Sequence, residues 1–423
     1  MSKQLSEVLD QVERAYPDLR ETARLVLAAV ATTRLNRQHP LALILIGGPS
    51  SGKTSLLMPL TKGFKGTALH AGVLRVDDFT PASLVSHSAN RKSEELDKID
   101  LLPKLREKCV VVKEMAPMFT GHEDELMKKF GVFASVLDGE GYVCSSGSHG
   151  QRGYTDPIVF TLLGAVTPKV LQAKVYACLN AVGPRFCFAE MPARSLDATK
   201  WRGPDKNRKQ IETDASQAIG GFVEDLFNRI PAGSVERDEF LISDHSRERL
   251  SYIASLMAAL RSQVSFDVDE ERKPYISGVS TESPERAFRY LEQLVFGAAL
   301  LEGRKEIQDG DLKLALDVAL GSANPSIRRL VRVFFAADRP RTIHDLSVGL
   351  ELSNDTARKY AEQLQRFEVL RLVNVDGTKE WDLKPPFDSL RIQSKVANSA
   401  LNNREKTGKA EPAEDFWAGA PSQ

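Results

Sequence analysis

The sequence has few cysteines and no signal for export or membrane insertion. Its four cysteines, Cys109, Cys144, Cys178 and Cys187, are widely spaced and form no CxxC pair, which fits small core residues in a reducing compartment. The first thirty residues are too charged for a signal peptide, and no apolar run approaches membrane-spanning length. The sequence therefore predicts a cytoplasmic protein without a membrane partner.

Net charge is also absent, because 57 basic residues balance 57 acidic ones. A nucleic-acid surface would have to be a local patch, so the charge balance neither supports nor excludes DNA as a partner. The chain of 423 residues is 42% hydrophobic and 27% charged, which is typical of a globular protein with two or three domains. No internal repeat is visible.

Strand-like apolar runs alternate with helical patterns between residues 41 and 190, which predicts an α/β domain built on a parallel sheet. The five runs are LALILI, TALHAGVLRV, CVVVKE, IVFTLLGAV and RFCFAEM. Helical periodicity replaces them afterwards, so we expect an all-helical second module. The expected division is a helical cap at 1–38, an α/β core at 39–204, a helical module at 205–323, a third unit at 324–386 and a disordered tail at 387–423.

The stretch GGPSSGKT, residues 47–54, matches GxxxxGK[ST] directly after the first apolar run and before a helical pattern. Glycines let consecutive backbone N–H groups point inward to cradle phosphates, the lysine reaches the outer phosphates and the threonine can ligate magnesium. The pattern predicts a site for ATP and Mg²⁺. Its residues are Gly47, Gly48, Pro49, Ser50, Ser51, Gly52, Lys53, Thr54 and Ser55.

The third apolar run ends in VVVKE, where nucleotide-hydrolysing folds place a magnesium acid. Glu114 is the only acid there, so we expect it to hold magnesium together with Thr54 or to polarise the attacking water. Lys113 cannot hold magnesium. Asp77 and Asp78, after the second run, could replace the missing carboxylate or form a helix cap or turn. A site that binds ATP without turnover is the alternative.

Two further residues are candidates for catalysis. Thr167 ends the fourth run and could orient water near the γ-phosphate, or it could simply form a Thr-Pro turn. Arg185 follows a Gly-Pro turn at the start of the fifth run. It could reach a neighbour's nucleotide and stabilise transition-state charge, or form a salt bridge at the strand start.

Residues 40–323 resemble the AAA+ ATPases in their phosphate loop, strand order, polar residue after the fourth strand, arginine before the fifth and helical lid. GPRFCF is similar to the arginine-finger segment of minichromosome-maintenance helicases. SPERAFRYLEQLVFGAALLEGRKEIQDGDLKLAL is similar to their lid, whose sensor arginine reaches back to the γ-phosphate. Arg286 matches that sensor, with Arg289 one turn away. The resemblance implies a homo-oligomeric ring, a hexamer, with Glu114 as the catalytic glutamate. Lys113 departs from the family's paired acids.

The segment LDGEGYVCSSGSHGQRGYTDPIVF has a glycine-rich tip between two strand-like arms, which predicts a β-hairpin. It resembles the pre-sensor hairpin of the same ATPases, which lines a pore and contacts DNA. The resemblance makes His149, Arg152 and Tyr154 the tip residues. A plain surface hairpin is the alternative.

Residues 324–386 show helical patterns at 326–337, 342–350 and 354–367, then two short strands joined at Asp376-Gly377. This order predicts a winged helix-turn-helix. If it docks in a major groove, its DNA contacts would include Arg358, Lys359 and Lys379. Winged helices also serve as protein-docking modules, so a protein partner is the alternative.

These features favour a ring-forming AAA+ ATPase that hydrolyses ATP to translocate on or remodel DNA, and is helicase-like. The alternative is a nucleotide-gated, DNA-bound assembly factor with slow or no turnover, such as an initiator, a transposition regulator or a phage-defence component. An ATP-dependent protein remodeller would explain the fold but not the third unit.

Overall fold

The fold is α/β, as the alternating pattern predicts, and is built on one five-stranded parallel sheet. The computed structural model describes residues 3–62, 71–77, 80–86, 92–146, 150–192, 207–268 and 274–391. The strand order is β2-β3-β6-β1-β7, and every neighbouring pair is parallel. The strands are β1 (Leu41–Ile46), β2 (Val73–Arg75), β3 (Cys109–Val112), β6 (Thr161–Val166) and β7 (Phe186–Glu190).

Both faces of the sheet are buried, which explains why its strands are continuous apolar runs. Successive side chains of a strand point to opposite faces. Strand β1 therefore contributes side chains to two separate hydrophobic clusters. Leu41, Leu43 and Leu45 belong to one hydrophobic cluster, whereas Ala42 and Ile44 belong to the other. Each residue of β1 therefore meets a helical layer.

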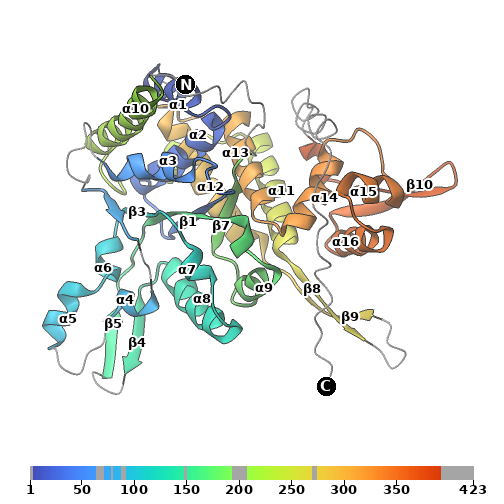
Figure 1. Cartoon of the computed structure of the whole chain (residues 1–423), viewed down its shortest axis with the longest axis horizontal. Helices are drawn as coiled ribbons and strands as arrows, with labels where there is room; N and C mark the ends of the chain where they lie inside the picture. The colour runs from blue at the N-terminus through green and yellow to red at the C-terminus, as the bar shows by residue number, and fades with distance from the viewer. Residues whose placement is uncertain are drawn as a thin grey trace.

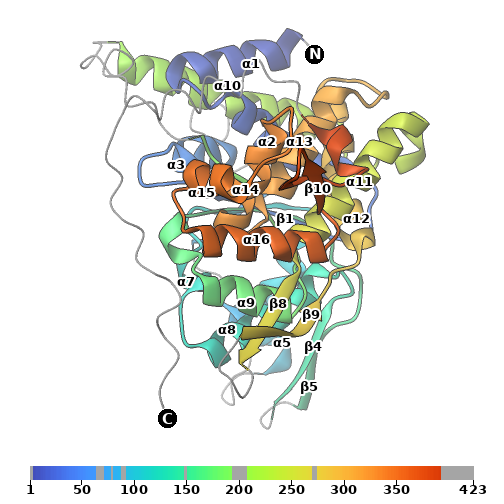
Figure 2. The same cartoon turned by 90° about the vertical axis from the view of Figure 1, so that its right-hand side faces the viewer.

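The two layers come from different parts of the chain. The first cluster includes residues of α1 (Lys3–Ala15), α2 (Arg20–Ala31), α10 (Arg208–Arg229), α11 (Asp244–Arg261), α12 (Pro284–Leu301) and α13 (Asp309–Gly321). The second includes residues of α4 (Pro81–Leu84), α6 (Leu102–Leu105), α7 (Ala116–Phe119), α8 (Glu123–Leu137) and α9 (Ala173–Ala181). In Figures 1 and 2, α1 and α10 lie side by side across the top of the molecule.

The expectation of an all-helical second module is wrong in one place. A hairpin of β8 (Gln263–Val268) and β9 (Pro274–Ser280) separates α11 from α12. Helix α11 ends at Arg261, and QVSFDV then alternates polar and apolar residues, which is the period of a strand. The helical pattern of the preceding residues hid this change.

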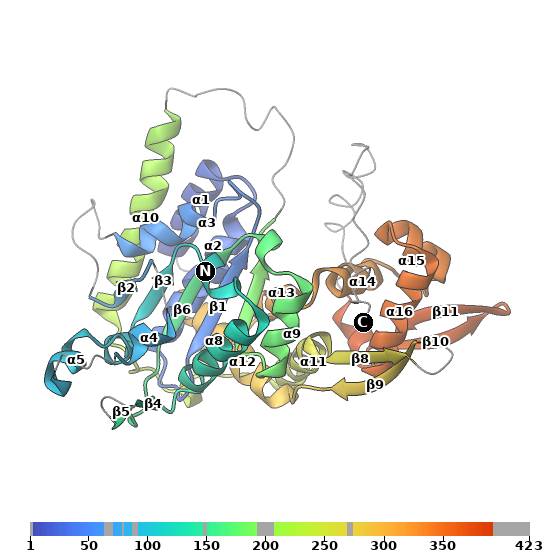
Figure 3. The same cartoon turned by 60° about the horizontal axis from the view of Figure 1, so that its bottom comes forward.

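The hairpin before the fourth core strand is present. Strand β4 (Tyr142–Ser146) pairs antiparallel with β5 (Gly150–Tyr154). In Figures 1 and 3 this hairpin lies beside α4 and α5 (Ser93–Ile99), at the opposite end of the molecule from the C-terminal unit. Any surface on the hairpin is thus remote from one on that unit.

The C-terminal unit has the expected order of elements. It comprises α14 (Pro325–Phe335), α15 (Ile343–Leu350), α16 (Asn354–Arg366), β10 (Leu370–Val375) and β11 (Thr378–Leu383). Asp376 and Gly377 both have positive φ, 49° and 81°, as a tight two-residue turn between these strands requires. The assignment of this unit as a winged helix stays a prediction.

The expected start of the tail at residue 387 is wrong. Phe387–Leu390 forms a 3₁₀ helix, η7, and its two apolar side chains, Phe387 and Leu390, are buried. Two buried apolar residues are enough to keep this short segment packed, and it lies against α11. The remainder of the predicted tail, from residue 392, lies outside the described residues.

All four cysteines carry free thiols, and all but Cys144 are buried. Burial raises the pKa of the Cys109 thiol to about 12, so this group behaves as a small core residue. Within the described residues, no helix is both long and apolar enough to cross a bilayer.

Candidate functional site

The glycine-rich loop follows β1 and turns back tightly on itself. The N–H of Gly47 donates to the carbonyl of Val166 at 3.1 Å, which fixes the loop to β6. Ser50 and Gly52 have positive φ, 58° and 94°, a region that favours glycine. A Cβ atom at Gly52 would lie 2.4 Å from Cδ1 of Leu19. The loop therefore needs glycine at position 52 both for its backbone angle and for space.

Lys53 lies over this loop. Its side chain is only 8% exposed, and Nζ donates to the carbonyl oxygens of Gly47 and Gly48, the latter at 2.8 Å. Burial lowers the pKa of the Lys53 ammonium, and the charge of Glu114 partly offsets this. Thr54, the next residue, is exposed. The loop thus presents one buried cation, and its exposed hydroxyls are those of Ser50 and Thr54.

The helix after the loop is short. Helix α3 spans only Lys53–Leu57, and the 3₁₀ turn η2 (Met58–Thr61) follows. Pro59 lacks an N–H and cannot continue an α-helix. A Cβ atom at Gly220 of α10 would lie 2.9 Å from the carbonyl oxygen of Lys62. Helix α10 therefore packs against the backbone directly after the 3₁₀ turn.

Glu114 and Thr167 lie at the same edge of the sheet as the loop. Glu114 follows β3 and Thr167 follows β6, which lies between β3 and β1. Oε1 of Glu114 accepts from the N–H of Ala116 at 3.1 Å. The N–H of Met115 donates to the carbonyl of Ala165 at 2.8 Å, which ties this segment to β6. The sequence-predicted loop, acid and polar residue are thus brought together.

Oxygen donors suited to magnesium are present, although no second carboxylate lies beside them within the described residues. The Thr54 hydroxyl and the Glu114 carboxylate are ligands that Mg²⁺ prefers. Lys113 is exposed. Asp77 lies at the end of edge strand β2, about 14 Å across the sheet from β1 at ordinary strand spacing, and it pairs with Arg75 at 2.9 Å. Asp77 is therefore too far away, and Asp78 lies outside the described residues.

Arg185 lies at the other edge of the sheet. Phe186 pairs with Ala42 at the start of β1, so Arg185 is about 15–20 Å from the phosphate loop by strand rise. Its Nε and Nη2 donate to the two carboxylate oxygens of Asp138 at 3.1 and 2.9 Å. Its Nη1 donates to the carbonyls of Val182 and Gly183. This is the salt bridge that the second interpretation of Arg185 predicts.

The expectation that Arg286 reaches this chain's own γ-phosphate does not fit the fold. Arg286 begins α12 beside Arg185, and a Cβ atom at Gly183 would lie 3.2 Å from its Nη1. Arg289 donates to Glu285 and contacts Nε2 of His39, which precedes β1. Because α12 begins at the edge where β1 starts, both arginines face away from the phosphate loop. Among the described residues, Arg286 has no hydrogen-bond partner.

These arginines line a pocket of about 450 Å³. Arg261 ends α11 and pairs with Glu282 at 3.4 Å. Burial raises the pKa of the Glu282 carboxyl, and Arg261 and Arg286 offset this only in part. Sequence reasoning missed Asp138, Arg261 and Glu282, because no local pattern marks which charged residues of distant segments converge at one edge.

Two of the three predicted tip residues of the β4–β5 hairpin are turned inward. Arg152 is 6% exposed at its side chain and pairs with Asp100 at 3.1 Å and with Asp97 at 2.5 Å. The Tyr154 hydroxyl donates to Asp100 at 2.9 Å. Their prediction as DNA-contacting tip residues is therefore wrong, because both side chains are used to anchor the hairpin to α5 and the residue after it. His149 lies outside the described residues.

The basic residues proposed for the C-terminal unit are accessible. Arg358 and Lys359 lie on α16, and Lys379 lies on β11; all three are exposed. Within the described residues, none of them forms an ion pair, whereas neighbouring Lys384 pairs with Glu368 at 3.1 Å. These cations remain available for an anionic partner, and their role stays a prediction.

Comparison of the sequence with protein-family models gives no match, and comparison with curated proteins gives none either. Among solved structures, the fold is similar to that of a proposed ATPase from Cytophaga hutchinsonii ATCC 33406. The TM-score is 0.40 at 13% sequence identity, over 76% of this chain and 86% of that chain. A likeness this distant does not bear on function. What the geometry itself defines is an α/β protein with a glycine-rich loop at the carboxyl edge of a parallel sheet.

Proposed function

We propose that this chain is a magnesium-dependent ATPase that assembles head to tail into a ring and acts on DNA. The observation that carries the proposal is the shared edge of β1, β6 and β3, where the loop with Lys53, the Thr167 position and Glu114 lie together. Ligands of open parallel sheets bind at this carboxyl edge. No membrane or export function is part of the proposal.

Each residue at this edge has a distinct chemical task. Backbone N–H groups of the loop and the Lys53 ammonium bind the phosphates, because charge-assisted hydrogen bonds to phosphate are strong. Thr54 and Glu114 would hold magnesium, which neutralises charge on the phosphates when bound. Glu114 also orients the attacking water and accepts its proton, while Thr167 holds that water in line. The products are ADP and inorganic phosphate.

Hydrolysis is proposed to depend on assembly. Arg185 and Arg286 lie at the amino edge of the sheet, opposite the phosphate loop. A head-to-tail interface places the amino edge of one copy against the carboxyl edge of the next, and such interfaces close into rings. Arg286 is the better candidate to reach a neighbour's nucleotide, because Arg185 is held by Asp138.

The alternative function, a nucleotide-gated assembly with slow turnover, is favoured by two observations. Arg185 would have to leave a bidentate ion pair before it could act on a neighbour. Lys113 occupies the place where a second carboxylate would assist magnesium binding. Both features would slow hydrolysis without preventing ATP binding.

Mixing two inactive variants tests assembly and catalysis together. Glu114→Gln lacks the acid and Arg286→Ala lacks the trans-acting cation, so each alone is expected to hydrolyse ATP at about 1% of the wild-type rate or less. In an equimolar mixture, complete sites form where a loop from Arg286→Ala meets an arginine from Glu114→Gln. Random assembly makes about one site in four complete, so the mixture should regain about a quarter of wild-type activity.

The control for this experiment is the double variant that carries Glu114→Gln and Arg286→Ala in the same chain. This protein can form no complete site. An equimolar mixture that stays as inactive as its components would overturn action in trans. Wild-type protein that binds ATP but hydrolyses it no faster than Glu114→Gln would instead establish the slow-turnover alternative.

The second part of the proposal places DNA on the C-terminal unit. Its support is the pair of exposed, unpaired cations Arg358 and Lys359 on α16. Replacement of both by alanine should weaken duplex binding about tenfold and reduce the slope of log affinity against log salt by about 2. Fluorescence anisotropy with labelled duplex measures both. Arg366→Ala, which removes one cation from the same helix, serves as a control for nonspecific attraction. Unchanged affinity in the double variant would favour the protein-docking interpretation.

A further inference from the structure

A short chain of contacts joins the phosphate loop to the end of β7. Met191 follows β7, and its N–H donates to the carbonyl of Ile46 at 2.8 Å, directly before the loop. Its Sδ lies 3.6 Å from the Ser51 hydroxyl, and a Cβ atom at Gly47 would lie 3.2 Å from the same sulfur. Met191 is 4% exposed. The phosphate loop therefore packs directly against the Met191 side chain.

The residue before Met191, Glu190, forms ion pairs with the C-terminal unit. The two carboxylate oxygens of Glu190 each accept from a different arginine of α14, Oε1 from Arg328 at 3.2 Å and Oε2 from Arg332 at 2.6 Å. Arg328 is 5% exposed at its side chain, and its Nη1 donates to the carbonyl of Gly321 at 3.0 Å. The first helix of the C-terminal unit thus holds the last residue of β7 from two sides.

The junction around this ion pair leaves little room for independent movement. Strand β7 is the outer strand of the sheet, and the N–H of Phe188 donates to the Ser322 hydroxyl at 3.0 Å. A Cβ atom at Gly321 would lie 2.3 Å from the carbonyl oxygen of Phe188. Since such close-packed contacts shift as a unit rather than deform gradually, movement of α14 would be passed to β7.

We propose that Glu190 is a positioning residue for the phosphate loop, and that the C-terminal unit sets its position through Arg328 and Arg332. Glu190 acts through Met191, which supports Gly47 and Ser51. The inference rests on the proposed nucleotide site and adds its regulation: a partner that moves α14 changes nucleotide affinity. By linkage, nucleotide binding changes the state of α14 by the same free energy.

Nucleotide affinity of full-length variants tests this relay. Arg332→Gln and Glu190→Gln are each expected to weaken binding of a fluorescent ATP analogue with Mg²⁺ about tenfold, within the usual range of coupling between sites. Arg332 is half exposed at its side chain, so its replacement should leave the fold intact. The double variant should bind no more weakly than either single variant, because both changes break the same link. Arg332→Lys, which keeps the charge, should restore part of the affinity.

Tyr176→Phe provides a matched control in the same place. The Tyr176 hydroxyl is buried and has no hydrogen-bond partner in the described structure. Burial raises its pKa to about 12, while the charge of Arg328 lowers it and that of Glu190 raises it. Removing a hydroxyl that makes no hydrogen bond should cost nothing. Nucleotide affinity of Tyr176→Phe is therefore expected to equal that of the wild type.

Hydrogen exchange of α14 distinguishes a relay from a merely structural ion pair. ATP should change deuterium uptake of Pro325–Phe335 in the wild type and in Tyr176→Phe, but not in Glu190→Gln. Unchanged nucleotide affinity in Glu190→Gln and Arg332→Gln, with binding by the wild type intact, would overturn this inference and leave the proposed function standing. Absence of ATP binding by the wild type would overturn both.

Discussion

Lys53→Ala is expected to weaken ATP binding at least 100-fold. The Lys53 ammonium is the only cation that the structure buries within the loop's own residues, 47–55, and a charge-assisted bond to phosphate contributes about 1.5–3 kcal/mol. Desolvation strengthens the interaction further, because the local dielectric is lower than that of water. Titration with a fluorescent ATP analogue in the presence of Mg²⁺ measures the loss directly.

Lys113→Ala is the natural comparison for that variant. Lys113 has the same charge and lies at the same edge of the sheet, but it is exposed, so water screens its charge. Its removal should change ATP affinity by no more than about threefold. If Lys53→Ala and Lys113→Ala both bind ATP as tightly as the wild type, the loop is not a phosphate site. Loss of binding in both would give Lys113 a direct contact with nucleotide.

The sequence was sufficient for features that depend on local pattern. Buried parallel strands need apolar residues on both faces, so LALILI and CVVV could be recognised without knowledge of their neighbours. The phosphate loop follows from one strand and a fixed spacing of glycine and lysine. Ser353 directly precedes the helical pattern at 354–367 and is a residue type that favours helix caps. Its hydroxyl accepts from the N–H of Thr356 at 3.2 Å.

The hairpin shows what local pattern does not determine. Arg152 and Tyr154 are two residues apart, so alternation places them on the same face of β5. Only the position of Asp100, some fifty residues earlier in the chain, makes that face the buried one. Asp100 is fully buried and also accepts from the N–H of Ser86. A distant residue thus converts two candidate DNA contacts into an anchor.

The placement of Arg286 depends on topology in a similar way. The residues around it are those of a helix start, with a Ser283 cap and Pro284 in the first turn. Whether that start lies at the carboxyl or the amino edge of the sheet is decided by the path of α11 and of the β8–β9 hairpin, which the helical pattern concealed. The sequence identified the helix start, and the fold placed Arg286 at the amino edge of the sheet, away from the loop.

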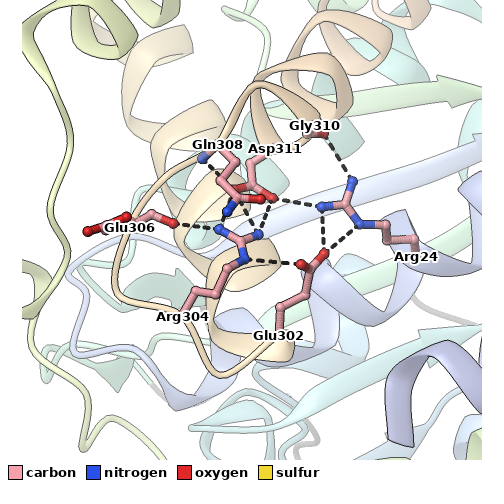
Figure 4. A network of polar contacts seen from close by, with 7 residues as sticks. All are labelled: Arg24, Glu302, Arg304, Glu306, Gln308, Gly310 and Asp311. Carbon is pink, nitrogen blue, oxygen red and sulfur yellow. Dashed lines mark hydrogen bonds and ion pairs between the residues drawn. The ribbon is translucent and has the colours of Figure 1, made fainter. Parts of the chain in front are cut away.

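The largest effect on stability is expected at a buried ion network that joins α2 to α12 and α13. Arg24 donates to Glu302 at 2.9 Å and to Asp311 at 2.7 Å, and Arg304 donates to the same two carboxylates, each at 3.0 Å (Figure 4). Asp311 is fully buried, and it also accepts from the N–H of Gln308 at 2.9 Å. The positive charges of the two arginines equal the negative charges of the two carboxylates. Removal of any one group therefore leaves a buried charge without its partner.

Asp311→Ala should lower the free energy of unfolding by about 3–5 kcal/mol, because it leaves two guanidinium groups buried beside a single carboxylate. Glu285→Ala, which removes the exposed partner of Arg289, should cost less than about 1 kcal/mol. Urea denaturation at neutral pH, followed by circular dichroism, gives both values. A loss below 1 kcal/mol in Asp311→Ala would mean that the network is not formed.

The pH dependence of stability, compared between the wild type and Glu302→Gln, provides a sharper test of the network. Burial opposes ionisation of Glu302, but its bonds with Arg304 and Arg24 outweigh this and lower its pKa. A carboxyl whose folded pKa is lowered adds stability that is fully present above its unfolded pKa, about 4.3, and is lost as pH falls through the folded value. The wild type should therefore lose its advantage over Glu302→Gln, which lacks this carboxyl, only below about pH 4. If the advantage disappears already near neutral pH, the carboxylates do not carry it.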